Sequence, residues 1–160
     1  MPMPGYLSIT AETQGAIEGE VNLTDREGTI EVLACQHTVK VPTSSNYGMS
    51  SGGRIHLPIS ITKVLDRSSP MLQQALCTNE LLTEVNIDWY RTDGAGMDEM
   101  YYKMKLSNAQ ITAIHFDVQN THTREYSERG HLETITMIYD QIIWSHEVDG
   151  VEFEDTWTTG

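Results

Sequence analysis

The feature that most constrains the fold of this chain is an alternation of apolar and polar residues with a period of two. In four separate stretches, apolar residues recur at every second or fourth position, which is typical of strands with one buried and one wetter face. These apolar rows are Ile55, Leu57, Ile59, Ile61 and Leu65; Val85, Ile87 and Trp89; Tyr102, Met104 and Leu106; and Ile135, Met137, Tyr139 and Ile143. The spacing predicts a chain made mainly of β-strands.

Two predicted strands change parity partway. Ile30 and Val32 lie on one parity, whereas Cys35, Val39 and Val41 lie on the other. The row from Ile135 likewise gives way to Ile142 and Trp144. Such a change indicates a β-bulge or burial on both faces, and bulges let a sheet curl into a barrel. We therefore expect an all-β fold over residues 1–160, a single domain in which two sheets form one closed or nearly closed β-barrel.

One short helix is predicted at about residues 69–78. Ser68 and Ser69 are candidate caps, and Pro70 follows at an early helical position. An apolar stripe then follows with helical spacing, at Met71, Leu72, Ala75 and Leu76. We expect this helix to flank the barrel.

Turn residues separate the predicted strands. Residues 25–28, 93–96 and 149–150 combine Asp with Gly and predict tight connections. The stretch 42–53 contains twelve polar or flexible residues, which is more than a hairpin needs. Long loops of this kind are usually functional or mobile.

The charge of the chain excludes some partners. A formal net charge of −13 disfavours nucleic acid, because phosphate binding needs clustered basic residues, and it disfavours anionic membrane surfaces as well. No apolar run approaches the ~20 residues of a membrane helix, and the first residues lack the pattern of a secretory signal. The two cysteines, Cys35 and Cys77, are too few for a disulfide framework, so we expect reduced thiols.

Motifs for catalysis, metals or cofactors are absent from the sequence. The six histidines do not form a metal-ligand spacing such as His-Glu-x-x-His, and no Gly-x-Ser-x-Gly elbow occurs. Cys35 and His37 share one strand face, so a thiol–imidazole pair is conceivable, but nothing in the sequence indicates a lowered thiol pKa. We predict that the chain is not an enzyme and has no cofactor.

Three segments, read in order, resemble one family. They are an acidic hairpin at Asp25–Val32, a strand that runs into the capped helix at Arg54–Leu72, and the region from His131 to Trp144. The most specific piece is the run from Thr62 to Pro70, with Thr62, Lys63, Asp66, Ser68, Ser69 and Pro70. In the first segment the likeness is carried by Asp25, Arg26, Glu27 and Gly28. Together the segments resemble the haemolysin-coregulated protein (Hcp) family, the inner-tube subunits of the type VI secretion system.

The resemblance implies an assembly. Members of this family form hexameric rings that stack into a hollow tube, so the implied partners are further copies of the chain, sheath proteins around the tube, the spike protein (VgrG) at its tip and small effector proteins in its lumen. The resemblance also implies assembly in the bacterial cytoplasm, followed by secretion to the extracellular space or a target cell without a signal peptide.

The loop at 42–53 matches the extended loop with which family members contact neighbouring rings and protomers. Tyr47, Gly48 and Met49 are its candidate contact residues, and Arg54 at its exit is a candidate to pair with an acid on the next subunit.

Three other interpretations remain open at this point. A phage-like tail-tube protein would share the barrel and the ring. A stand-alone ligand-binding β-barrel would be a monomer, and a hydrolase would use Cys35 or the scattered acids.

Overall fold

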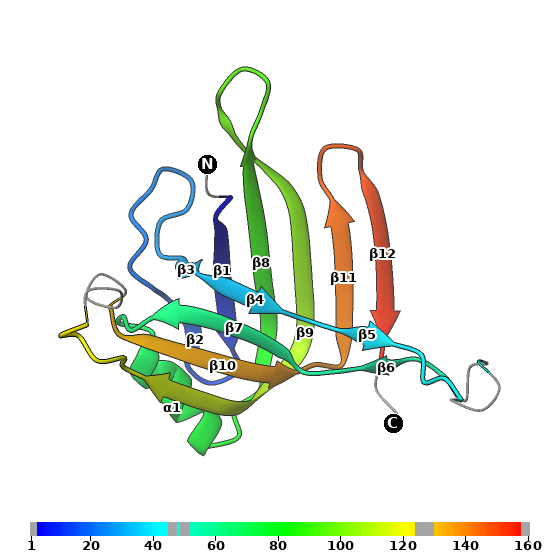
Figure 1. Ribbon diagram of the computed structural model, residues 1–160, viewed down its shortest axis with the longest axis horizontal. Helices are drawn as coiled ribbons and strands as arrows, with labels where there is room; N and C mark the ends of the chain where they lie inside the picture. The colour runs from blue at the N-terminus through cyan, green and yellow to red at the C-terminus, as the bar shows by residue number, and fades with distance from the viewer. Residues whose placement is uncertain (1–2, 45–47, 49–51, 124–129, 158–160) are drawn as a thin grey trace.

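The computed structural model describes residues 3–44, 48, 52–123 and 130–157, and over these it contains twelve strands and one helix (Figure 1). The predicted contact residues Tyr47 and Met49 lie outside the described residues. Ten strands belong to one continuous sheet that folds over itself into two layers, and the other two form a separate pair.

The first layer has the order β2-β1-β8-β9-β11-β12, with β3 also paired to β1. The second layer has the order β9-β10-β7-β4. The strands of the first layer are β1 Gly5–Ala11, β2 Gly15–Ile17, β3 Ile30–Val32, β8 Leu82–Thr92, β9 Asp98–Asp117, β11 Gln141–His146 and β12 Val151–Thr156. Those added by the second layer are β4 Ala34–Gln36, β7 Ile59–Val64 and β10 Leu132–Ile138, and the separate pair is β5 Val39–Lys40 with β6 Ile55–His56.

The long strand β9 joins the two layers. Its first half pairs with β8 and β11, and its second half pairs with β10. Asn108 lies where the partners change and has a φ of 51°, a left-handed conformation that Asn tolerates better than most residues. The corner at Asn108 therefore lets one strand serve both layers.

The barrel is nearly closed by the segment Ile30–Gln36. Its first part, β3, pairs with β1 of the first layer, and its last part, β4, pairs with β7 of the second layer. The parity change between Val32 and Cys35 is thus a change of layer at Leu33, whose N–H donates to Thr62. The expected barrel of two sheets is confirmed, although this parity change has a different cause from the bulge or double burial that we predicted.

The second parity change has the same cause. After β10, the chain passes through Tyr139 and Asp140 from the second layer to β11 in the first. Register shifts do occur in the sheet, but at other places: between Thr10 and Ala11, between Trp89 and Tyr90, and between Thr136 and Met137.

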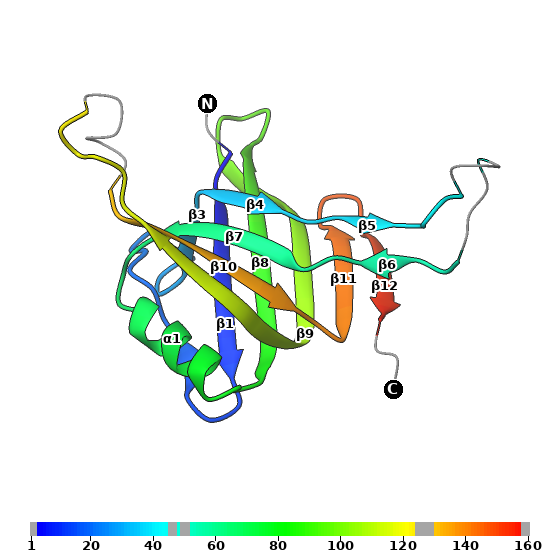
Figure 2. The ribbon, with the colours of Figure 1, turned by 60° about the horizontal axis from the view of Figure 1, so that its bottom comes forward.

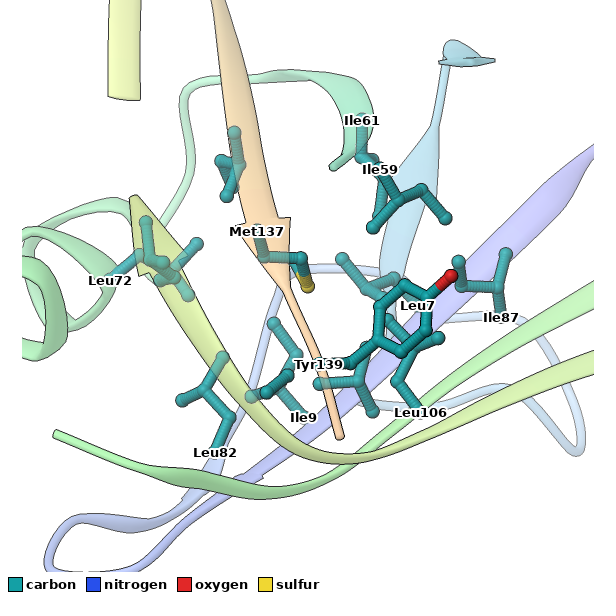
Figure 3. Close-up of a cluster of buried hydrophobic side chains, with 14 of the residues drawn as sticks. Leu7, Ile9, Ile59, Ile61, Leu72, Leu82, Ile87, Leu106, Met137 and Tyr139 are labelled. Carbon is teal, nitrogen blue, oxygen red and sulfur yellow. The ribbon is translucent and has the colours of Figure 1, made fainter. Parts of the chain in front are cut away.

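The two layers enclose the hydrophobic core (Figure 3). Leu7, Ile87 and Leu106 from the first layer face Ile59 and Met137 from the second, and all five have no exposed surface. Burial of one such side chain contributes about 1.5–3 kcal/mol, so the alternating rows supply the main stabilisation of the fold.

The helix α1, Ser69–Cys77, lies against β9 and covers one end of the barrel with Leu72 and Ala75 (Figure 2). Its bounds agree with the prediction, and Asn79 follows it in the left-handed conformation that commonly ends a helix. The predicted capping role was wrong in one respect. Ser68 occupies the N-cap position, but its side chain makes no cap hydrogen bond, because the hydroxyl is turned to Asp66.

The pair β5–β6 is the base of a projection that we call the arm, described here over residues 38–44, 48 and 52–57. Figures 1 and 2 show the described part of the arm extending beyond β12. It carries the predicted long loop, and Val39 and Val41 are exposed on it. In the described part of the chain, no helix has the length and apolar character to cross a membrane.

Candidate assembly surfaces

The most specific sequence motif forms a buried polar cluster at the start of α1. Lys63 is fully buried, and its Nζ lies 2.5 Å from Oε1 of Glu133, which is directly opposite in the β7–β10 register. The same nitrogen lies 3.1 Å from Oδ1 of Asp66 and donates to Oγ of Ser69 at 3.1 Å. A buried lysine needs such partners, since an unpaired buried charge is very costly.

Two serines complete the cluster. Ser69 Oγ donates to Glu133 at 2.7 Å and accepts from the backbone N–H of Asp66 at 3.0 Å, while the N–H of Ser68 donates to Asp66 at 2.9 Å. Pro70 follows at a position where a helix needs no N–H donor. The motif thus fixes the beginning of α1 to β7 and β10, and its role is structural. Lys63 stands out in the sequence as part of the motif, whereas Glu133 does not, because no local pattern marks a partner 70 residues away.

The motif at residues 25–28 attaches a loop to the first layer. The guanidinium of Arg26 lies over the rings of Tyr6 and Tyr90, 5.1 Å and 4.1 Å from their centroids, and pairs with Asp98 at 3.2 Å. Asp25 and Gly28 on either side adopt positive φ angles of 71° and 77°. The turn conformation places Arg26 between two aromatic rings, a favourable cation–π arrangement.

The arm is attached to the barrel by hydrogen bonds of two side chains, Arg54 and His56. Nε and Nη2 of Arg54 donate to the two carboxylate oxygens of Asp155 at 2.5 Å and 2.7 Å. Nη2 also donates to the carbonyl oxygen of Thr156 at 3.0 Å. Arg54 is therefore paired within its own chain, yet 47% of its side chain remains exposed. Gly48 has a φ of 64°, and its N–H donates to Ser44 within the loop.

A chain of hydrogen bonds runs from the arm into the barrel. Tyr139 Oη lies 2.7 Å from Nε2 of His37 and 2.6 Å from Nδ1 of His56, and Nε2 of His56 lies 2.7 Å from Asp155. Trp144 stacks on both imidazole rings, and the ring centroids of Trp157 and His56 are 5.0 Å apart. The hydrogen bond from Arg54 lowers the pKa of Asp155, and burial raises the pKa of Tyr139.

The outer face of the second layer is free of charged side chains on β4, β7 and β10. The cross-strand register places the following residues on this face: Ala34, Gln36, Ser60, Thr62, Val64, Leu132, Thr134, Thr136 and Ile138. Hydroxyls pair across it, Ser60 with Thr136 and Thr62 with Thr134. We call this surface the uncharged face. A surface depression of about 370 Å³ at one side of it is lined by residues that include Gln36, His37 and Thr136.

The strand β12 is an edge of the first layer, since it pairs only with β11 in the described residues. Val151 and Phe153 point to the same side as the core residues of neighbouring strands, as their register with β11 shows, but they are 66% and 64% exposed. An open strand edge with apolar side chains is a surface suited to contact another protein chain.

The structure gives no support to a catalytic thiol at Cys35. Burial raises the pKa of this thiol to about 11, whereas a nucleophilic cysteine needs a lowered pKa. His37 points instead to Tyr139. Within the described ranges, no group of three or more His, Cys, Asp or Glu side chains is arranged to hold a metal ion.

A nearly closed two-layer barrel with a projecting arm, an open strand edge and an uncharged face has the features of a structural protein whose surfaces suit contact with other protein chains. Comparison with known proteins gives the particular family. The model of the family described as "Type VI secretion system effector, Hcp" matches residues 6–146. The chain belongs to this family.

Individual relatives agree with this assignment. The chain is 39% identical to the Major exported protein of Pseudomonas aeruginosa, over 98% of this chain and 96% of that protein. A crystal structure of an Hcp protein superimposes with a TM-score of 0.92 at 30% identity, covering 99% of this chain and 100% of that one. The Hcp1 protein of Escherichia coli EAEC 042 gives a TM-score of 0.87 at 33% identity, covering 98% of this chain and 100% of that one.

The family resemblance and the function that it implied are therefore confirmed: the protein is a tube subunit of a type VI secretion system, from a family of secreted structural proteins that assemble into rings. This result favours the secretion tube over the phage-like tail tube, the stand-alone ligand-binding barrel and the hydrolase.

Proposed function

We propose that six copies of this chain form a ring, that rings stack into a hollow tube, and that the uncharged face lines the lumen. The observation that carries this proposal is the absence of charged side chains on that face of β4, β7 and β10, in a chain with a formal net charge of −13. The wall of a narrow lumen is where equivalent side chains of all the subunits come closest together.

Repulsion between like charges increases as the distance between them falls. Two like unit charges 10 Å apart in water repel by about 0.4 kcal/mol, and the repulsion grows where a protein wall replaces water. A ring multiplies each lumen charge by the number of subunits. The uncharged face avoids this cost, while Glu152 and Glu154 of β12 and acidic residues of the surface loops remain in solvent. Hydroxyl groups keep the wall wettable without a strong field.

The proposed lumen wall fits a carrier. Small effector proteins would meet Ser, Thr and Gln side chains there, which form weak neutral contacts that allow both retention and release. The spike protein (VgrG) would occupy the tube tip and sheath proteins the outside. The subunit would assemble in the cytoplasm, leave the cell with the tube without a signal peptide, and act without catalysis.

The arm supplies the proposed contact between rings and protomers. Tyr47 and Met49 remain candidate apolar anchors of this contact. Arg54 already binds Asp155 of its own chain, but its exposed part leaves room for a second carboxylate from a neighbouring subunit. The arm would then be held at its base by its own barrel and at its tip by the next ring.

Labelling in assembled rings tests the lumen assignment. In a background of Cys35→Ala and Cys77→Ala, Thr134→Cys places one thiol on the uncharged face. A maleimide gold cluster attached to it should appear inside the ring in averaged electron micrographs.

The matched control is Thr92→Cys in the same background, at the last residue of β8, next to the turn into β9. Its label should not enter the lumen. Thr134 labels on the outer rim of the ring would refute the lumen assignment, and a protein that shows no rings at any concentration would refute the tube itself.

A further inference from the structure

The arm is attached to the barrel through contacts that include titratable side chains. In the described residues, the hydrogen bonds from the arm to the rest of the chain all go to Tyr139, Asp155 and Thr156. The side chain of His56 is 1% exposed at this junction, and His37, just before the arm, joins the same tyrosine.

The direction of each hydrogen bond can be worked out along the series of side chains from Asp155 to His37. Asp155, ionised and held by Arg54, can only accept, so Nε2 of His56 must donate to it. When His56 is neutral, its Nδ1 must accept, and the donor is the hydroxyl of Tyr139. The oxygen of Tyr139 then accepts from Nε2 of His37. Each of the three bridging hydrogens then has an acceptor, so the series of hydrogen bonds is complete.

One added proton can be accommodated without the loss of a hydrogen bond in this series. His56 then donates from both nitrogens, and Tyr139 turns its hydroxyl hydrogen to His37, which accepts with Nε2. A second proton cannot be accommodated in this way. Both imidazoles would donate to the same oxygen of Tyr139, its own hydrogen would lose its acceptor, and two positive rings would face each other with centroids 6.4 Å apart.

We propose that the chain from His37 through Tyr139 and His56 to Asp155 is a proton-sensitive latch, which holds the arm against the barrel at neutral pH and releases it on acidification. The existence of the latch is independent of assembly, but its consequence, that acid weakens contacts made by the arm between rings, rests on the proposed function.

The sign of the effect follows from proton linkage. Burial and, to a smaller extent, the nearby His56 lower the pKa of His37 in the latched state. The latched arm therefore binds fewer protons than the free arm, so the stabilisation is present above the ordinary pKa of 6.5 and is lost as the pH falls below it. The other titratable or charged groups in contact are Tyr139, Asp155 and Arg54, and Trp144 of β11 and Trp157 after β12 do not titrate.

Hydrogen exchange of the full-length protein tests the latch. Exchange of peptides covering residues 38–57 is compared at about pH 7.5 and pH 5.5, with rates corrected for the intrinsic exchange at each pH. Both values lie above the sequence pI of about 4.7, so the net charge keeps its sign. We expect protection of the arm to fall by up to about tenfold at the lower pH, the limit for one group with an ordinary pKa of 6.5, while β8–β9 peptides, the folding control, stay unchanged.

Two variants make the test specific. His37→Gln keeps an amide donor for Tyr139 but does not titrate, so its arm should stay protected at both pH values. Tyr139→Phe breaks the chain in the middle, so its arm should exchange rapidly at both. The matched controls His146→Gln and Tyr101→Phe, at the other end of the β9–β11 pair, should keep the behaviour of the parent.

Arm protection in the parent that is equal at both pH values would overturn the latch, and so would an unaltered pH profile in His37→Gln or Tyr139→Phe. Ring stacking is recorded separately by electron microscopy at the same two pH values. If ring stacking is the same at both pH values although arm protection differs, the proposed role of the arm in assembly is wrong. The exchange data would still decide whether the latch exists.

Discussion

The buried pair Lys63–Glu133 should be a major determinant of stability, and its removal can be predicted in magnitude. The two side chains are 0% and 2% exposed, and the carboxylate accepts from both Nζ of Lys63 and Oγ of Ser69. Loss of one partner leaves an uncompensated buried charge, which typically costs about 3–5 kcal/mol. Asp66, 3.1 Å from Nζ, compensates in part when Glu133 is removed, so Glu133→Leu should cost about 3 kcal/mol.

The double variant separates pairing from burial. Lys63→Met with Glu133→Leu removes both charges and fills the space with apolar groups of similar volume, a replacement that is often neutral. The hydroxyl of Ser69 loses its acceptor, which leaves a residual cost of about 1 kcal/mol. The double variant should therefore be more stable than either single variant. Lys105→Met, which removes an exposed pair with Glu84 at 3.5 Å, is the control and should cost less than about 1 kcal/mol.

Urea unfolding followed by circular dichroism gives the free energies of unfolding. The protein concentration is fixed and low, because ring formation would add to apparent stability, and an unchanged slope with denaturant shows that the folded and unfolded states are comparable. Single variants that lose less than about 1 kcal/mol, or a double variant that loses the sum of the two, would show that the pair is not the coupled buried unit inferred from its geometry.

Three further outcomes are expected. Gly19→Ala should destabilise the fold by about 1–3 kcal/mol, because a Cβ there would lie 2.5 Å from the carbonyl oxygen of Thr29. Gly94→Ala, which has open space around the added Cβ, should not destabilise it. Equal unfolding midpoints of the two variants would contradict this prediction. Cys35, with its pKa raised to about 11, should react with a thiol reagent at pH 8 much more slowly than the exposed Cys77, and comparable rates would argue against burial of Cys35. Salt should strengthen ring assembly, since the Debye length falls from about 10 Å at 0.1 M to about 3 Å at 1 M, and steady dissociation of rings with rising salt in light scattering would contradict the repulsion argument.

Much of the fold could be predicted because it depends on local geometry. Alternation in rows such as Ile59–Ile61 and Val85–Ile87 follows from the two-residue period of a strand, and the helix at Ser69–Cys77 follows from spacing and an early proline. The two parity changes were visible in the sequence, but their cause was not. A strand that passes from one layer to the other looks, in a list of residues, the same as a bulge.

Partners across the fold could not be read from the chain. Lys63 was singled out by its motif, and Arg54 by its place after the long loop, but Glu133 and Asp155 lie 70 and 101 residues away from them. Tyr139 was assigned to an apolar row, and only the structure shows its hydroxyl between His37 and His56.

The sequence by itself determined the strands, the helix and the family, because periodicity and a specific motif are properties of neighbouring residues. Only the tertiary structure decided that hydroxyl residues of β7 and β10 share one uncharged face and that a histidine, a tyrosine and an aspartate meet at the base of the arm. Strand order and register bring such residues together, and these are set by the packing of the whole core.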